Sequence, residues 1–222
     1  MNQSIFGIAL FSAATAAVAT LLALPVAVGL GWLLSRRSFP GKALVETVVS
    51  LPLVLPPVAV GLLMLQLLGR ERPLGRLLDA VGIDVVFTWK AVVLAMTVMS
   101  LPLMVMTIRA GFEHVNRRFE AMAATLGASP LRVFWTITLP LARQSVVAGA
   151  LLGFARALGE FGATIVVAGG IPGQSQTLAV AIFNLTEAGR ESDANTLMFV
   201  SIAVAFAVLA TANAVQRQGR RT

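Results

Sequence analysis

Long apolar stretches, separated by short segments that carry most of the charged residues, dominate this sequence. The first stretch runs from residue 1 to residue 35 without a single charged side chain. About 20 apolar residues cross a bilayer core as a helix, and a helix satisfies its own backbone hydrogen bonds there. Charged residues make up 12% of the chain, whereas soluble domains carry about 25%. The sequence therefore predicts an all-α, polytopic membrane protein.

The apolar pattern predicts about five transmembrane helices in one integral-membrane domain that covers residues 1–222. The expected spans lie at about 5–34, 44–68, 90–108, 141–169 and 196–215. The first stretch has no basic segment before it, so we interpret it as a retained span rather than a secretory signal. Residues 170–195 contain an apolar run that is short for a span, which favours an external or re-entrant helix.

The basic residues predict the orientation. Eleven of the 17 lysines and arginines fall on segments expected on one side, beginning with Arg36 and Arg37, and only five fall on the other side. Because basic loops stay in the cytoplasm, the N-terminus is expected outside. The C-terminus, with Arg217, Arg220 and Arg221, is expected inside. Basic residues scattered between apolar runs indicate contact with a lipid bilayer and no nucleic-acid partner.

The residues needed for common catalytic sites are missing from the sequence. There is no cysteine, the single histidine is His114, and no glycine-rich phosphate-binding loop of the G-x-x-x-x-G-K-[ST] type occurs. A zinc site or a serine–histidine relay needs more than one such ligand or base. We therefore predict no catalytic residue, no metal site and no nucleotide site in this chain.

A polar-studded loop at about 113–140 predicts two short helices joined by a turn. The first is expected from about residue 116 to 126, after which Gly127 suits a helix C-terminus that needs a positive φ. Ser129 followed by Pro130 predicts an N-cap and the first residue of a second helix. That second helix is expected to end at Leu139 and Pro140.

Two spans carry residues that are unusual inside a membrane. Pro52, Pro56 and Pro57 in the second span predict a bend, either as a packing kink or as a pore-lining or gating helix. In the fourth span, Arg156 and Glu160 lie four residues apart, so on a helix they could pair.

Gly159 and Gly162, next to this pair, allow close helix approach or local unwinding. We leave open whether the pair is a structural ion pair or acts in gating or anion passage.

Residues 120–140 resemble the EAA loop of ABC importer permeases, which docks into a groove on the ATPase subunit. Glu120 is the acidic residue of that pattern, although Ala121 stands where a second glutamate is common. The resemblance implies a coupling helix-turn-helix. The residues that match it or lie in it are Glu120, Ala123, Gly127, Ser129, Pro130, Arg132, Ile137, Leu139 and Pro140.

Four stretches, at residues 50–61, 73–95, 120–140 and 153–183, together resemble the molybdate/sulfate branch of these permeases. The resemblance implies a homodimer in a bacterial inner membrane with two ABC ATPase subunits and an extracytoplasmic oxyanion-binding protein. It further implies that this chain binds no cofactor and that ATP and Mg²⁺ are held by the ATPase.

The segment ARALGEFGAT with the IPG that follows is nearest to molybdate permeases, with tungstate, sulfate or thiosulfate as alternatives. A secondary carrier and a membrane scaffold are the rival classes. Against the carrier stands the absence of internal repeats, and against the scaffold stand the kinked, charge-bearing spans.

Overall fold

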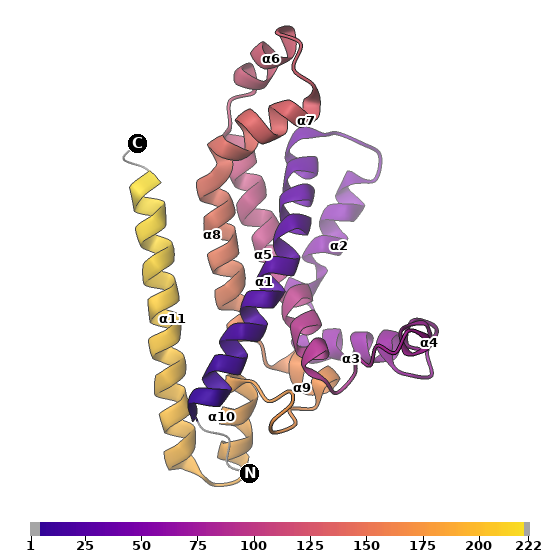
Figure 1. Cartoon of the computed structure of the whole chain (residues 1–222), viewed down its shortest axis with the longest axis vertical. Helices are drawn as coiled ribbons and strands as arrows, with labels where there is room; N and C mark the ends of the chain where they lie inside the picture. The colour runs from indigo at the N-terminus through magenta and orange to yellow at the C-terminus, as the bar shows by residue number, and fades with distance from the viewer. Residues whose placement is uncertain (1–4, 220–222) are drawn as a thin grey trace.

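A computed structural model describes residues 5–219, with side chains described up to residue 211, and contains helices but no strand within that range (Figure 1). Three single helices are long and apolar enough to span a membrane: α1 (Ile5–Arg36), α5 (Trp89–His114) and α11 (Glu191–Gly219). The continuous helical segment Pro130–Leu158, which ends in α8 (Leu139–Leu158), is the fourth. A bent pair, α2 (Lys42–Val54) and α3 (Pro57–Leu68), raises the number of candidate spans to five. The predicted fold class is therefore confirmed.

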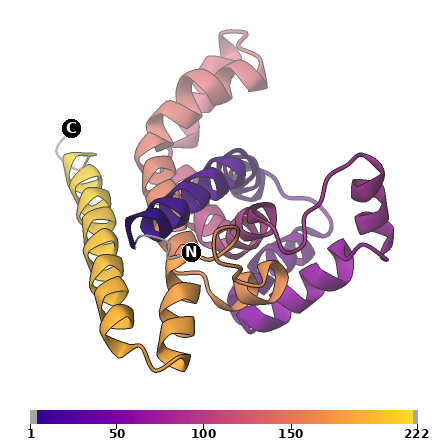
Figure 2. The ribbon, with the colours of Figure 1, turned by 60° about the horizontal axis from the view of Figure 1, so that its bottom comes forward.

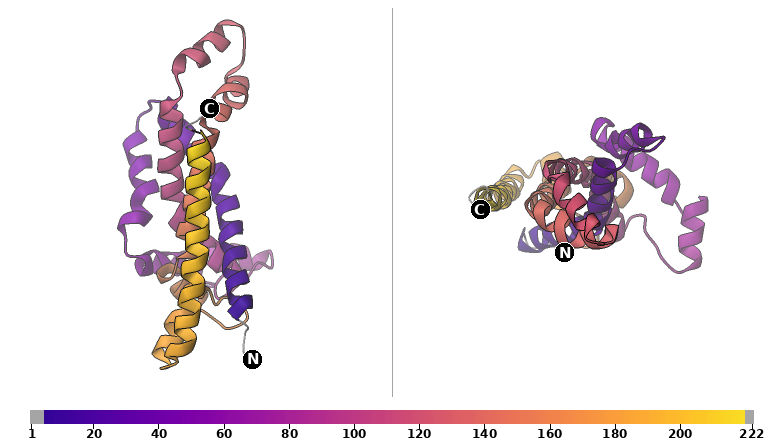
Figure 3. Two further views of the ribbon diagram at one scale, coloured as in Figure 1. Left: turned by 90° about the vertical axis from the view of Figure 1, so that its left-hand side faces the viewer. Right: turned by 90° about the horizontal axis from the view of Figure 1, so that it is seen from above.

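Helix α5 is the centre of the bundle and packs against both α1 and α8, which also contact each other. Small residues allow these helices to approach closely. A Cβ atom added to Gly149 of α8 would lie 2.8 Å from Cγ1 of Ile108, which is fully buried in α5. Of the most apolar 18 residues of each helix, 61% are buried in α5 and only 11% in α11. Helix α11 lies along the outside of the bundle (Figure 3).

The second expected span, 44–68, is not one straight helix. Helices α2 and α3 meet at an angle of 114°. Because Pro56 disfavours the α-region for the residue before it, Leu55 adopts an extended conformation and α2 ends there. Pro57 then occupies the first turn of α3, where the missing N–H costs nothing. Helix α3 and the short α4 (Pro73–Ala80) project sideways from the bundle (Figure 2).

The fourth expected span, 141–169, is also interrupted, which corrects the prediction of one helix. Helix α8 ends at Leu158, and a separate helix α9 (Gly162–Ala168) follows after three non-helical residues. The predicted short helix after residue 170 is α10 (Leu178–Glu187), which packs against α11.

The two ends of the bundle are formed by different elements. Helix α1 begins near α9 and α10, whereas α6 (Arg117–Thr125) and α7 (Pro130–Val133) form the opposite end, toward which α11 runs (Figure 1). Arg220 and Arg221, which the sequence predicts to be cytoplasmic, lie outside the described residues, and so does the side chain of Arg217.

Candidate coupling loop and the two helix breaks

The turn after α6 has the geometry that its sequence predicts. Gly127 has a φ of +82°, a region that favours glycine. Its N–H donates to the carbonyl of Ala124, and the next N–H, of Ala128, donates to the carbonyl of Ala123, both at 3.0 Å. These two bonds form a Schellman motif, which satisfies carbonyls at the end of a helix. The turn is therefore rigid.

The second helix of the loop begins as predicted but does not end where predicted. Oγ of Ser129 accepts the N–H of Arg132, and Pro130 is the first helical residue. Helix α7 continues into a π-helical turn, η1 (Phe134–Thr138), and then directly into α8. Pro140 is the physical reason for the wide turn, because a proline ring clashes with the carbonyl four residues before it. The second helix of the loop, η1 and α8 thus form one continuous helical rod, Pro130–Leu158.

The carboxylate of Glu120 connects α6 to two other elements. Its Oε1 accepts Nε of Arg36 at 3.1 Å and Oγ1 of Thr138 at 2.7 Å. Nη2 of Arg36 also donates to the carbonyl of Val115 at 3.1 Å. The sequence singled out Glu120 for a contact with an ATPase. That contact stays a prediction, and the structure adds internal partners that lie far away in the sequence.

Neighbouring contacts strengthen this junction. Nη2 of Arg117 donates to the carbonyl of Ser35 at 3.1 Å. The rings of Trp32 in α1 and Phe134 in η1 meet edge to face, with 5.5 Å between their centres. The C-terminal turn of α1 is thus connected to both helices of the loop.

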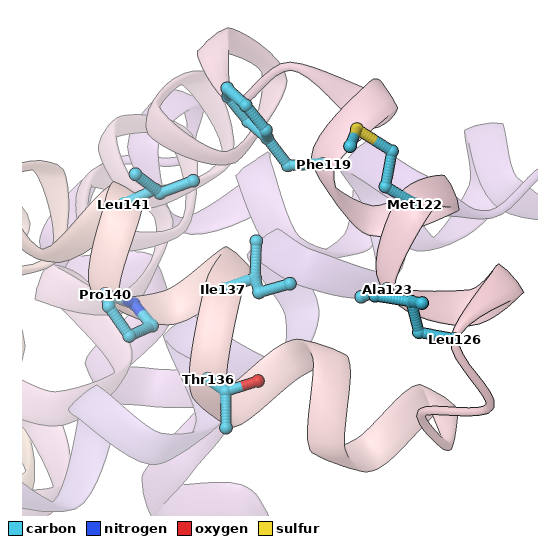
Figure 4. Close-up of a pocket in the computed structure, with 8 residues that line it drawn as sticks. All are labelled: Phe119, Met122, Ala123, Leu126, Thr136, Ile137, Pro140 and Leu141. Atoms are coloured by element: carbon cyan, nitrogen blue, oxygen red, sulfur yellow. The ribbon is translucent and has the colours of Figure 1, made fainter.

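An apolar groove lies between α6 and the rod that contains η1. We call it the α6 groove; it has a volume of about 460 Å³ and is lined by Phe119, Met122, Ala123, Leu126, Thr136, Ile137, Pro140 and Leu141 (Figure 4). Leu126, at its rim, is 88% exposed. Two further apolar side chains, Leu131 and Trp135, are exposed on the same loop.

Sequence reasoning assigned Ala123, Ile137 and Pro140 to the coupling loop but missed the exposed apolar side chains around them. The signal was present, since large apolar residues within a polar window are unusual. Exposed apolar surfaces of this kind occur at contact sites for proteins, membranes or ligands.

The break between α8 and α9 is closed by the predicted ion pair. Nη1 of Arg156 lies 2.6 Å from Oε2 of Glu160. The sequence predicts that both residues lie on one helix. In the structure they do not, because Glu160 follows the end of α8. Its other oxygen, Oε1, accepts the N–H of Ala163 at 2.8 Å and so caps α9. Glu160 is only 1% exposed, and capping and pairing together satisfy its charge.

The two breaks pack against each other. A Cβ atom at Gly162 would lie 2.8 Å from Cβ of Pro57, and one at Gly61 would lie 2.7 Å from the carbonyl oxygen of Ala163. Glycine at both positions lets α3 and α9 touch through their backbones. Of the predicted pathway or gating residues, Pro57, Gly162 and Glu160 therefore lie at one joint.

Pro56 and Gly159 lie next to this joint, and Thr164 lies within it. Gly159 is exposed, with only an ordinary contact to its own helix. Oγ1 of Thr164 is buried and has no hydrogen-bond partner among the described residues.

The molecule is a multi-pass membrane protein of the permease type. It combines several long apolar helices with a rigid helix pair at one end and paired helix breaks near the other. Residues 23–217 match the family described as "Binding-protein-dependent transport system inner membrane component". The chain belongs to this family.

Known relatives agree with that assignment. The chain is 48% identical over 198 residues, 88% of this chain and 86% of the relative, to the molybdenum transport system permease protein ModB of Escherichia coli K12. It is 44% identical to ModB of Haemophilus influenzae over 194 residues, 86% of this chain and 85% of that relative. Among solved structures, a chain of the MetNI methionine ABC transporter in an inward-facing conformation superposes with a TM-score of 0.74. It is 14% identical to this chain, and the match covers 98% of this chain and 99% of that chain. The architecture is thus that of ABC importer permeases.

Proposed function

We propose that this chain is the permease subunit of an ATP-driven importer of molybdate. The observation that carries the proposal is the 48% identity, over most of both chains, to a molybdenum transport permease. Tungstate, which has the same charge and shape, is expected to share the pathway. Sulfate and thiosulfate remain the alternative cargoes within the same family.

The assembly that fits the chain has two copies of it in the bacterial inner membrane and two ABC ATPase subunits. An extracytoplasmic protein delivers the oxyanion. ATP and Mg²⁺ bind to the ATPase. The N-terminus faces outward and the loop end faces the cytoplasm, because most lysines and arginines lie at that end.

The coupling loop is the docking site for the ATPase in this proposal. The α6 groove and the exposed Leu131 and Trp135 offer exposed apolar surface at the loop end of the molecule. Such surface is stabilised by burial against a partner, at about 25 cal/mol per Å².

The loop can transmit motion because it is stiff. The Schellman turn at Gly127 fixes α6 relative to α7, and α7 continues through η1 into α8. A displacement of the loop by the ATPase therefore moves α8 as a rigid body. The same loop is connected to α1 through Glu120.

The joint between α3 and α9 is our candidate for the moving part of the pathway. Pro56, Pro57, Gly159 and Gly162 supply the breaks, and Glu160 neutralises Arg156 there. A neutral pair suits an oxyanion pathway, because an unpaired buried arginine would trap a dianion.

A pull-down of the tagged, detergent-solubilised protein tests the coupling. Wild type is compared with Gly127→Pro, which cannot adopt a φ of +82° and removes the N–H that donates to Ala124. An ATPase subunit is expected with the wild type and is expected to be lost or weakened with the variant. If no nucleotide-binding partner accompanies a folded wild-type chain, the importer proposal is wrong and a secondary carrier becomes the better hypothesis.

The cargo is tested by uptake of radiolabelled molybdate into cells or proteoliposomes that contain the whole importer. Unlabelled tungstate is expected to compete strongly and sulfate weakly. Stronger competition by sulfate or thiosulfate than by tungstate would assign the chain to a sulfate-type importer.

A further inference from the structure

Arg36 is the last residue of α1, and its side chain is only 8% exposed although it ends a helix at the loop side of the molecule. The sequence counts it merely as one of several basic residues after the first span. In the structure its guanidinium donates three hydrogen bonds or ion-pair contacts. Nε and Nη2 lie 3.1 and 3.0 Å from Oε1 of Glu120, and Nη2 also donates to the carbonyl of Val115.

The next residue provides a natural comparison. Arg37 has the same charge and follows Arg36 directly, but its side chain is exposed. It makes no side-chain hydrogen bond or ion pair with any residue that the structure describes. Position near the membrane surface therefore does not explain the burial of Arg36.

Helix α6 depends on this contact because it has little apolar packing of its own. Within α6, all of whose residues the structure describes, none is fully buried. Its Phe119 and Met122 point into the α6 groove and are exposed. What holds α6 is polar: the Schellman turn at one end, the bond from Arg117 to the carbonyl of Ser35 at the other, and Oε1 of Glu120, shared by Arg36 and Thr138, on its inner side.

Three elements thus meet at one carboxylate oxygen. Arg36 belongs to α1, Glu120 to α6, and Thr138, which is 1% exposed, to η1 at the base of α8. A charged, multiply bonded contact of this kind has a fixed geometry. It fixes the orientation of α6 relative to both spans at the same time.

We propose that Arg36 is a positioning residue for transport: it holds α6 so that displacement of the coupling loop moves α1 together with α8. Without it, the bond from Arg117 to Ser35 remains, but that bond lies at the first residue of α6 and does not fix the orientation of the helix. Helix α6 then pivots between Asn116 and Gly127, and part of the displacement is lost. The inference rests on the proposed function, since it assumes that an ATPase moves the loop.

The first experiment measures the orientation of α6 directly and needs no ATPase. The chain contains no cysteine, so spin labels attach only at introduced sites. Ser38→Cys places a label at an exposed position beyond α1, and Ala121→Cys places one at an exposed position on α6. Double electron–electron resonance then gives the distribution of distances between the two labels. Labelled chains are diluted with unlabelled ones so that only distances within a chain count. We expect Arg36→Gln to broaden the distribution and Arg37→Gln to leave it unchanged; equal distributions in both would overturn the proposal.

The second experiment measures coupling in the complete importer, with loaded binding protein as the stimulus. Arg36→Gln is expected to retain the ATPase subunit, because the α6 groove is intact. The ratio of stimulated to basal ATPase activity, and uptake with it, should fall about tenfold, within the usual range of coupling between sites. For Arg36→Lys, this ratio should lie between those of the wild type and Arg36→Gln, since an ammonium keeps the charge but cannot reproduce the planar fork.

Double variants separate positioning from general damage. Adding Glu120→Gln to Arg36→Gln should cause no further loss, because both changes break the same ion pair and the glutamine oxygen can still accept from Thr138. If Arg36→Gln does not fold, Thr138→Val removes a hydroxyl donor to the same oxygen with little change of shape, and should show a smaller loss in the same ratio.

The outcomes distinguish the inference from the proposed function. Absence of an ATPase from the wild-type preparation contradicts the proposed function, whereas the spin-label result still decides whether Arg36 orients α6. Arg36→Gln behaving like Arg37→Gln in stimulated ATPase activity contradicts the inference alone. Loss of the ATPase subunit from a folded Arg36→Gln variant also contradicts it, since Arg36 would then shape the docking surface.

Discussion

Arg156 and Glu160 meet across the end of α8, with Nη1 of the arginine 2.6 Å from Oε2 of the glutamate. The second oxygen of Glu160 accepts the N–H of Ala163 and thereby caps α9. One carboxylate therefore joins the helix before the break to the helix after it. The arginine is 26% exposed, while the glutamate is 1% exposed. The break is held by a specific pair of charged groups and does not act as a loose linker.

Glu160→Gln should destabilise the permease because it leaves Arg156 without its partner. We expect a loss of about 2–3 kcal/mol in the free energy of unfolding, at or below the range for a broken buried pair because Arg156 is partly exposed. Thermal unfolding in detergent measures this. The double variant Arg156→Gln/Glu160→Gln should recover at least half of the loss, since no unpaired charge remains.

Glu187→Gln is the control, because Glu187 is exposed and forms no ion pair within the described part of the chain. Unchanged stability, uptake and ATPase coupling in Glu160→Gln would show that the pair has neither a structural nor a transport role.

Gly162→Ala should disturb the joint between α3 and α9, whereas Gly159→Ala should be tolerated. The new methyl group at 162 would lie 2.8 Å from Cβ of Pro57 and 3.2 Å from the backbone nitrogen of Val58. At 159 the nearest atom is 3.8 Å away, which is an ordinary contact. Overpacking of this kind costs about 1–3 kcal/mol. Unfolding midpoints and uptake rates that are equal for the two variants would contradict the packed joint.

Gly127→Ala should weaken capture of the ATPase by strain alone. Space is not limiting, since an added Cβ would meet no atom within 4 Å. A φ of +82° costs an alanine about 1–2 kcal/mol, which corresponds to a several-fold loss of affinity if the turn opens. Binding of the purified ATPase to the immobilised permease measures it.

Gly29→Ala is the matched control for that change. Gly29 lies inside α1, also has open space around it and has no positive φ. Gly127→Asn should retain more binding than Gly127→Ala, because asparagine tolerates the left-handed region better. Equal binding by the alanine variants at 127 and 29 would show that the turn geometry does not matter for docking.

Leu126→Ser should reduce ATPase capture without affecting the stability of the permease. The side chain is 88% exposed at the rim of the α6 groove, so it contributes little to folding of the isolated chain. Full burial of a leucine in a contact contributes about 1.5–3 kcal/mol, so affinity should fall tenfold or more. Leu77→Ser, at an exposed leucine of α4 near the other end, should leave capture unchanged. A loss of stability without loss of capture would place Leu126 in the fold instead of the interface.

Features that depend on a few consecutive residues were predictable. Gly127, Ser129 and Pro130 specify a left-handed residue, a cap and a helix start, and the structure contains all three. The number of candidate spans followed from apolar length in the same way. Pro56 and Pro57 predicted a bend but not its 114° angle, because the angle depends on what α3 packs against.

Contacts between distant residues were not predictable from one sequence. Arg36 and Glu120 are 84 residues apart, and no local pattern indicates their pairing. The same holds for Pro57 against Gly162. The interruption of the fourth span was also missed, since residues 159–162 read equally well as part of a helix with an internal ion pair.

The sequence by itself determined that this chain is a multi-pass helical membrane protein with a rigid helix pair between two spans. Apolar length and local backbone preference are properties of short segments, so they can be read without knowing the fold. Only the tertiary structure decided which charges neutralise one another, where the spans break and which apolar side chains stay exposed on the loop. Those features depend on helices brought together from across the chain, because a buried charge persists only where a distant partner compensates it.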